Sequence, residues 1–462
     1  MKVKYSVLPA LFVFILFLSG PLCAQRETKD PTIYSNIGLG FGARALGMGG
    51  AFIALADDIT AINFNPAGLA QLLKPEISLG FKFGGITNKY AAFSRTYSGV
   101  PSVDNQIVTQ GAVDLKYNQF VFDYGGFVLP LNMFNIPIAI GFAYQKKLPS
   151  SYSYSLTYPY KAEFTDYTDY YYGDMSYENL ESSGGYNSLS FSLASKLADF
   201  FYLGFNINYW TGSVTTDYGW GYDGNHYWYG NPFYFETLDY TDNRKYSVSG
   251  ISFDAGLLLK FDMVSLGFVY KSKFTPSLDY TYDIEQEESY GYIPGTVYIL
   301  SGSAGGTEKA SITWPYSLGG GIAFRPVSAL TITADFFYTA WSGGLIDWED
   351  TSWTDTGYPV DEPQNSYQIR GGMEYLIVFE GGALPLRFGG FLDKQIFLDI
   401  DDEPLNFIGL TFGTGLVFKN FVWDVAGVFR LGSYKSSDYR ADNNKFTSWN
   451  VVSSLSFRFD IK

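Results

Sequence analysis

Apolar and polar residues alternate along most of the chain from residue 75 onward. Leu189, Phe191 and Leu193 are separated by Ser190 and Ser192, and later segments repeat this pattern. Side chains of a strand point alternately to opposite faces, so each such segment has one apolar and one polar face. The alternation predicts about fourteen strands, at residues 76–84, 117–129, 137–147, 187–198, 201–211, 248–261, 263–273, 313–325, 329–341, 367–379, 384–394, 407–418, 421–432 and 447–461.

The connections between these strands are short and long in turn. Strands of roughly ten alternating residues joined in this way are typical of transmembrane barrels, which have short periplasmic turns and longer extracellular loops. A soluble β-sandwich, the alternative, leaves the alternation of loop length unexplained and requires many apolar side chains to face water. The sequence therefore predicts an all-β fold, a transmembrane antiparallel β-barrel of about 14 strands.

Composition supports a barrel and argues against several other classes. Aromatic residues make up 19% of the chain, with 39 Tyr and 40 Phe, as expected of a barrel with aromatic girdles at both membrane interfaces. After the N-terminus, no stretch has the roughly 18 apolar residues that a membrane helix needs. The net charge of −15 argues against nucleic acid as a partner, because phosphate binding needs a basic surface.

The N-terminus has the features of a secretory signal. Lys2 and Lys4 precede an apolar stretch at residues 7–18, and Ala24 is the expected last residue of the signal. A lipoprotein beginning at Cys23 is the weaker alternative, since small residues should precede that cysteine. We expect a signal peptide at residues 1–24, an N-terminal extension and lumen-plugging segment at 25–74, and a barrel at 75–462, located in the cell outer membrane.

Catalysis and cofactor binding are not expected. The only histidine, His226, lies among tyrosines and tryptophans in an expected loop, where it is not placed to activate a serine nucleophile. No Cys/His cluster offers a metal site, and acidic loop clusters are interpreted as solvated. The glycines around Gly40 and Gly49 do not complete a nucleotide-binding fingerprint. We interpret them as tightly folded backbone in a confined space.

Charged residues within the predicted strands are expected to face the lumen. Both signs occur, so most of them should pair with one another and stiffen the interior, whereas one or two cations are available for a carboxylate headgroup. The candidate lumen charges are Arg325, Asp335, Arg370, Glu374, Arg387, Asp424 and Arg430.

Two parts of the chain resemble a known family. Gly42-Ala43-Arg44-Ala45-Leu46-Gly47-Met48-Gly49-Gly50-Ala51-Phe52, followed by Asn63-Phe64-Asn65-Pro66-Ala67-Gly68-Leu69, resembles the start of FadL/TodX-type transporters (the OmpP1/FadL/TodX family). The late segments around Phe324-Arg325-Pro326 and Gln368-Ile369-Arg370-Gly371 resemble the late strands of that family.

The resemblance implies a fourteen-stranded barrel whose N-terminal segment is a hatch that plugs the lumen. It also implies passive uptake of a hydrophobic compound, such as a long-chain fatty acid or a hydrocarbon, through a shift of the hatch and a sideways opening. The hatch motif corresponds to Asn65, Pro66, Ala67, Gly47, Gly49 and Gly50. Candidates for the floor of the ligand pocket are Leu46, Met48, Phe52, Ile53 and Leu55.

Other functions remain open at this point. A related PorV-like branch has a similar hatch and escorts cargo in a type IX secretion system, and the tyrosine-rich loops also suit a structural or adhesive surface barrel. The expected partners are outer-membrane lipid, a hydrophobic small molecule and the barrel assembly machinery. No cofactor is expected, and the barrel is expected to be a monomer.

Overall fold

A computed structural model describes most of the chain beyond its N-terminus. The described residues are 39–90, 93–97, 106–110, 113–133, 135–149, 152–164, 170–228, 231–292, 297–343, 346–348, 364–398, 403–435 and 444–460. The expected signal peptide at residues 1–24 and the polar extension that follows it lie outside them.

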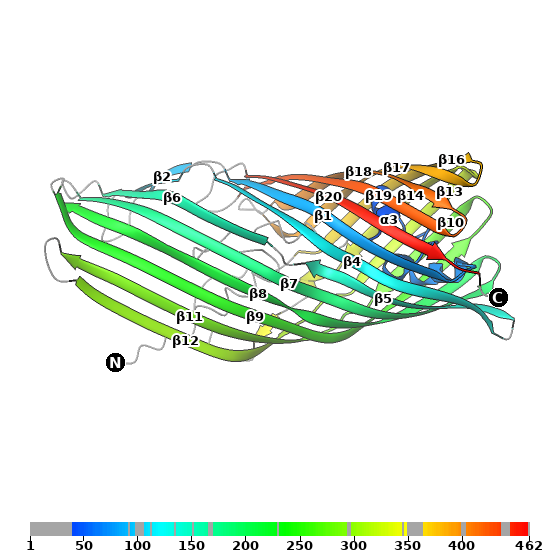
Figure 1. The fold of residues 1–462 in the computed structure, drawn as a ribbon, viewed down its shortest axis with the longest axis horizontal. Coiled ribbons are helices and arrows are strands. Elements are labelled where there is room, and N and C mark those ends of the chain that lie inside the picture. The colour runs from blue at the N-terminus through cyan, green and yellow to red at the C-terminus, as the bar shows by residue number, and fades with distance from the viewer. Residues whose placement is uncertain are drawn as a thin grey trace.

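Fourteen strands form a closed antiparallel barrel (Figure 1). Each pairs with the next along the wall, and β20 pairs with β1 to close the ring. The wall strands are β1 (Glu76–Tyr90), β4 (Val113–Met133), β5 (Ile136–Pro149), β7 (Tyr170–Ala198), β8 (Phe201–Trp228), β9 (Asn231–Lys260), β10 (Val264–Lys271), β13 (Ser317–Val327), β14 (Leu330–Thr339), β16 (Ser366–Phe379), β17 (Gly382–Leu398), β18 (Pro404–Phe418), β19 (Phe421–Tyr434) and β20 (Asn444–Arg458). All fourteen overlap the ranges predicted from alternation, so the predicted fold class is confirmed.

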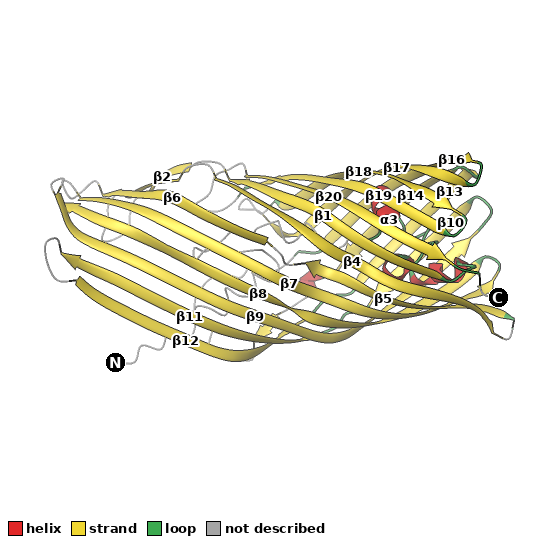
Figure 2. Ribbon diagram, in the orientation of Figure 1, coloured by secondary structure: helices red, strands yellow, loops and turns green. Residues whose placement is uncertain are grey.

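Six further strands occupy the described parts of the long connections. They are β2 (Phe93–Tyr97), β3 (Gln106–Gln110), β6 (Tyr152–Phe164), β11 (Ser277–Tyr292), β12 (Val297–Ile312) and β15 (Ile346–Trp348). With the far halves of β7, β8 and β9, they extend one side of the wall well beyond the other (Figures 1 and 2). We call this the loop end of the barrel, and the opposite end, where short turns join the strands, the turn end.

The long connections that the predicted strands leave at 148–186, 212–247 and 274–312 were expected to be loops. That expectation is wrong, because most of their described residues are in strands. The ladder between β8 and β9 continues through Thr216↔Arg244 and beyond. Alternation fails there because residues on the outer face, such as Asp217 and Asn243, are polar although the strand persists. Outside lipid, a strand needs no apolar outer face, so its sequence no longer shows the period-two pattern.

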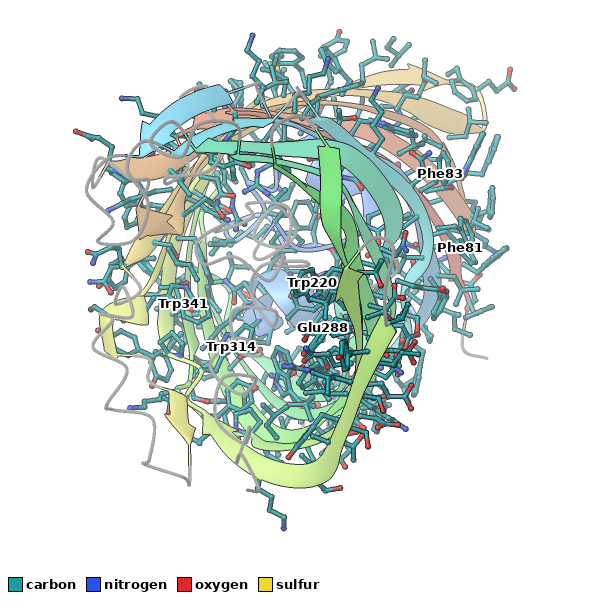
Figure 3. All side chains as sticks on the ribbon, turned by 90° about the vertical axis from the view of Figure 1, so that its left-hand side faces the viewer. Phe81, Phe83, Trp220, Glu288, Trp314 and Trp341 are labelled. Carbon is teal, nitrogen blue, oxygen red and sulfur yellow. The ribbon has the colours of Figure 1, made fainter. Side chains whose placement is uncertain are left out.

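The two faces of the wall differ as the alternation predicted. Phe205, Phe253 and Phe429 on the outer face expose 57%, 54% and 50% of their surface, whereas Ser192 and Asn206 on the inner face expose 0% and 1%. Figure 3 looks along the barrel from the loop end and shows Phe81 and Phe83 outside the wall. This arrangement suits a wall surrounded by lipid, with its polar groups turned inward.

Candidate functional site

Residues 39–74, which we call the luminal segment, cross the interior of the barrel. They contain α3 (Ala43–Gly47), α4 (Ala61–Phe64) and the 3-10 helix η1 (Pro66–Gln71). The helix α3 contacts β17 to β20, whereas η1 contacts β5, β7, β8 and β9 on the other side of the ring. The segment is buried against wall residues in a shared apolar core. It therefore lies inside the barrel, nearer the turn end than the loop end (Figure 1).

Glycines in the wall allow the backbone of this segment to approach the strands closely. A Cβ added at Gly204 would lie 2.3 Å from the nitrogen of Ala67, and one at Gly372 would lie 2.2 Å from the carbonyl oxygen of Met48. A Cβ at Gly389 would lie 2.3 Å from the nitrogen of Gly49. Real Cβ atoms do not tolerate such distances, so these positions are shaped to receive the luminal segment.

The motif Asn65-Pro66-Ala67 fixes the turn between α4 and η1. The Asn65 side chain is fully buried. Its Nδ2 donates to the carbonyl oxygens of Ile53 (2.9 Å) and Leu257 (3.0 Å). Its Oδ1 accepts from the backbone N–H of Ala67 at 3.2 Å and so caps η1. One amide thus joins two parts of the luminal segment to each other and to β9.

The other residues of the predicted hatch motif are Gly47, Gly49 and Gly50, and they lie where the chain makes a tight turn at the end of α3. Gly49 and Gly50 have φ angles of +69° and +74°, a left-handed conformation that glycine adopts without strain. The N–H of Gly49 donates to Oγ1 of Thr411 (2.9 Å), and that hydroxyl donates to the carbonyl oxygen of Gly47 (3.0 Å). The turn is thereby fastened to β18.

Arg44, in α3, is the centre of an ion network with the wall. Its Nε and Nη2 each donate to Glu374 at 3.0 Å, and its Nη1 pairs with Asp57 at 2.6 Å. Arg387 lies 2.7 Å from both Glu374 and Asp424. Mutual pairing satisfies most of these buried charges, so the network holds the α3 half firmly to β16, β17 and β19.

The remaining candidate lumen charges contact either the luminal segment or other residues of the inner wall. Asp335 accepts the backbone N–H groups of Phe52 (2.6 Å) and Ile53 (2.9 Å). Arg370 donates to the carbonyl oxygen of Gly50 at 3.1 Å. Arg325 lies 3.6 Å from Asp57, and Arg430 pairs with Asp393. Five of the seven candidates, Asp335, Arg370, Glu374, Arg325 and Arg387, thus belong to the surroundings of the luminal segment.

A cavity of about 180 Å³ lies on the loop-end side of the luminal segment. Its aromatic lining comes from the segment and from several strands, and Figure 3 shows two members, Trp314 and Trp341, at the lumen. These two rings meet at 5.3 Å, and Trp210 lies 5.6 Å from Trp314. Charged side chains of both signs also line the cavity, namely the cations Lys82, Lys146, Lys147, Lys271, Arg370 and Lys394 and the carboxylates Asp123, Asp254 and Asp393.

Of the five predicted floor residues, Ile53 lines this cavity. Met48, Phe52 and Leu55 lie in the core shared by the luminal segment and the wall, and Leu46 packs with Phe391 and Val428. Sequence reasoning missed the lining residues Lys147 and Lys271. Lys147 lies two residues after the inward-facing Gln145, and Lys271 lies two residues after the inward-facing Val269. The alternation along each strand could therefore have identified both lysines as inward-facing.

The wall beside the cavity has a seam. Ladder pairing between β4 and β5 ends at Tyr124↔Gln145, beyond which β4 pairs with β1 and β5 pairs with β7. Within the described residues, Oδ2 of Asp123 and both amide atoms of Gln145 are buried there without a hydrogen-bond partner. Asp123 and Lys146, on the two sides of the seam, both line the cavity.

Among the described residues, no helix is long and apolar enough to cross a membrane. The same residues contain no group of three or more His, Cys, Asp or Glu side chains placed to hold a metal ion.

A closed barrel with an apolar outer face and polar side chains on its inner face is a transmembrane barrel of the outer-membrane type. The family model of outer membrane transport proteins (OMPP1/FadL/TodX) matches residues 35–351, well over half of the chain. The chain belongs to this family, so it is an outer-membrane transport protein rather than an enzyme. No curated protein matches its sequence.

Solved structures show the same fold at low identity. A FadL homologue from Pseudomonas aeruginosa is 16% identical, with a TM-score of 0.57 over 91% of this chain and 98% of that one. The toluene transporter TodX of P. putida is 15% identical, with a TM-score of 0.53 over 92% and 99%. The monoaromatic hydrocarbon channel CymD is 14% identical, with a TM-score of 0.51 over 92% and 98%.

Proposed function

We propose that the chain is a channel for passive uptake of hydrophobic compounds and that the luminal segment is its hatch. The observation that carries this proposal is the cavity with its aromatic rings, which lies on the loop-end side of the luminal segment and is lined in part by it. Short turns face the periplasm in such barrels. A compound entering from the loop end therefore reaches the cavity before it meets the hatch.

We propose a long-chain fatty acid as the preferred substrate. Aromatic rings suit a hydrocarbon chain as well as toluene, the compound named for TodX. However, Lys147 and Lys271 place two ammonium groups among these rings, and such groups form strong, charge-assisted hydrogen bonds with a carboxylate. A neutral hydrocarbon makes no such bonds.

The size of the cavity requires movement during transport. Ligand pockets typically enclose roughly 300–1,000 Å³, whereas this cavity encloses about 180 Å³. A long acyl chain therefore needs more space, which a shift of the hatch provides. We propose that the chain then leaves sideways into lipid through the seam between β4 and β5, where no ladder hydrogen bonds need to be broken within the described wall.

Uptake in cells that lack their own fatty-acid channel tests this proposal. Cells expressing the chain should take up labelled oleate faster than cells with an empty vector. An Asn65→Ala/Pro66→Ala variant, shown to insert equally well, should lose this gain, and Asn118→Ala, a change at an exposed wall residue, should retain it. Toluene uptake measured in parallel separates the two substrate classes.

The outcomes distinguish the candidate functions. Uptake of oleate but not toluene supports the fatty-acid proposal, and the reverse result replaces it with hydrocarbon uptake. A well-inserted barrel that transports neither compound contradicts the uptake function.

A further inference from the structure

The outermost strand of the extended wall, β12, has one long edge without a neighbouring strand. Its other edge pairs with β11 along nearly the whole strand. Among the described residues, the first edge pairs only with β15, from Ala310 to Ile312. Figure 1 shows β12 at the margin of the loop-end extension. Residues 297–309 therefore present a row of backbone N–H and C=O groups that can pair with a further strand.

This edge begins with a run of exposed apolar residues. Exposure within Val297-Tyr298-Ile299-Leu300 ranges from 50% to 64%. Successive side chains point to opposite faces, so the run offers apolar surface on both faces of β12. Contact with lipid does not account for it, because Ile299 pairs with Ser289, and Ser289 pairs with Thr237, which are polar neighbours on the same face. Natural sheets usually protect such an edge with charges, proline or a covering segment.

The next part of the edge borders an acidic hollow on the outer face. After the apolar run, β12 continues with three small residues at 301–303. Together with Glu285 and Glu287 of β11 and Asp239 of β9, they line a hollow of about 340 Å³. Glu287 lies directly opposite Asp239 in the ladder, and like charges in that arrangement weaken strand pairing. A cationic side chain lying in the hollow would reduce this repulsion.

These features together define the chemistry of an occupant. A polypeptide in extended conformation pairs with a row of backbone N–H and C=O groups, as in β-strand addition. A lysine or arginine beside 301–303 can lie across these small residues and reach Glu285 and Glu287. A second copy of β12 lacks the required cations, because its one basic residue is Lys309, which lies opposite Asp279.

We propose that the edge of β12 binds an extended segment of another polypeptide, with apolar residues beside 297–300 and basic residues beside 301–303. The segment adds a strand to the wall outside the cell, because the short turns at the opposite end face the periplasm. The interaction uses neither the luminal segment nor the cavity. It is therefore a second function, separate from uptake, and the acidic hollow determines the charge of the partner rather than forming a site alone.

Binding of a labelled peptide to the full chain in lipid nanodiscs tests this proposal. The probe Arg-Thr-Arg-Val-Tyr-Val-Thr, antiparallel to β12, places its arginines beside 301–303 and its apolar residues beside the apolar run. Fluorescence anisotropy should show saturable binding of this peptide. The peptide Glu-Thr-Glu-Val-Tyr-Val-Thr should bind about tenfold more weakly, because two surface ion pairs become two repulsions.

The backbone contribution is tested with methylated peptides. Two versions of the arginine peptide carry methyl groups on alternate backbone nitrogens, one at the odd and one at the even positions. Both keep every side chain, but only one alternation blocks the N–H groups that face the edge of β12. One version should therefore lose binding, and equal binding of both versions at the level of the parent peptide would overturn strand addition.

Variants of the chain separate the apolar run from the hollow. Glu285→Arg/Glu287→Arg should reverse the preference, so that the glutamate peptide binds more tightly than the arginine peptide. Ile299→Lys should weaken binding of the arginine peptide about tenfold, through lost apolar contact and added repulsion. Asn243→Ala is the matched control, because this exposed residue lies on the same face but on β9, and it should bind as the wild type does. Uptake of labelled oleate should be the same in all of these variants.

Four other results would overturn the proposal. An unchanged preference after charge reversal would exclude the hollow, and no binding of the arginine peptide would exclude the edge as a whole. Dimers of the chain, detected by light scattering and absent in Ile299→Lys, would assign the edge to a second copy. Binding that appears only when residues 349–363 are deleted would assign it to the chain itself. Each of these results leaves the uptake function untouched.

Discussion

Replacing Asn65 by alanine should loosen the luminal segment without disturbing the barrel. The substitution removes the cap of η1, which typically contributes about 1 kcal/mol. It also removes a donor from the buried carbonyl oxygen of Ile53 and from the part-buried carbonyl oxygen of Leu257, at a cost of about 1 kcal/mol each. The docked state of residues 58–72 should therefore lose roughly 3 kcal/mol, about two orders of magnitude in its opening equilibrium.

Amide hydrogen exchange in liposomes measures this loss directly. In Asn65→Ala, residues 58–72 should exchange about a hundredfold faster than in the wild type, whereas the β18–β19 ladder should be unchanged. Asn118→Ala is the matched control, because it removes the same group from an exposed wall position. Exchange within a factor of about three of the wild type would refute the assigned role of the Asn65 amide, and faster exchange throughout the wall would show that the barrel itself depends on it.

Three further predictions concern docking and exit. Gly389→Ala should displace α3 and raise the ion leak of the barrel in planar bilayers, because its Cβ would lie 2.3 Å from the nitrogen of Gly49. Gly302→Ala, whose Cβ would have no atom within 4 Å, should leave the leak unchanged. Equal leaks in the two variants would contradict the role of Gly389 in receiving the luminal segment. Burial raises the pKa of the Asp58 carboxyl to about 6, with Arg44 opposing the rise. Because this pKa is above its unfolded value, ionisation weakens docking at pH 7.5, and docking should strengthen progressively as the pH falls from about 6 to about 4, by up to about 3 kcal/mol in total. Exchange corrected for its intrinsic pH dependence should show this change in the wild type and not in Asp58→Asn, and a variant that keeps the change excludes Asp58 as its source. Asp123→Cys and Lys146→Cys joined by a short thiol crosslinker should close the seam and stop uptake, and undiminished uptake would place the exit elsewhere.

The number of wall strands could be predicted because lipid constrains the outer face of every strand that it contacts. Phe253 and Phe429 must be apolar, so their neighbours Ser252 and Arg430 become recognisable as inward-facing. The extensions of β7 to β9 lack this constraint, because water accepts polar residues on both faces. Strand character there depends on ladder pairing between distant residues, such as Thr216 and Arg244, which no local pattern records.

The candidate site could be predicted only in part, for a similar reason. Parity placed Asp335, Glu374 and Arg387 inside the barrel, but it did not identify their partners, which depend on strand register and on the path of the luminal segment. Arg44 was not among the candidate charges although it is the centre of the network. It lies in a five-residue helix, too short to show a period, and its position is set by glycines of the wall.

The chemistry of the two halves of the luminal segment bears directly on the choice between acid and hydrocarbon. The ion pairs around Arg44 are mutually satisfied, so neither kind of ligand displaces them at a net gain. Lys147 and Lys271, which donate to Asn63, can instead form hydrogen bonds with a carboxylate. Toluene offers no such acceptor, so it can displace α4 only by packing against it. When Lys147 and Lys271 are both methionine, decanoate and its uncharged analogue decanol should therefore be taken up at the same rate. Uptake of toluene should rise, because α4 has then lost both lysine contacts. A parallel fall in uptake of decanoate and of toluene would mean that these lysines stabilise the wall instead of holding α4.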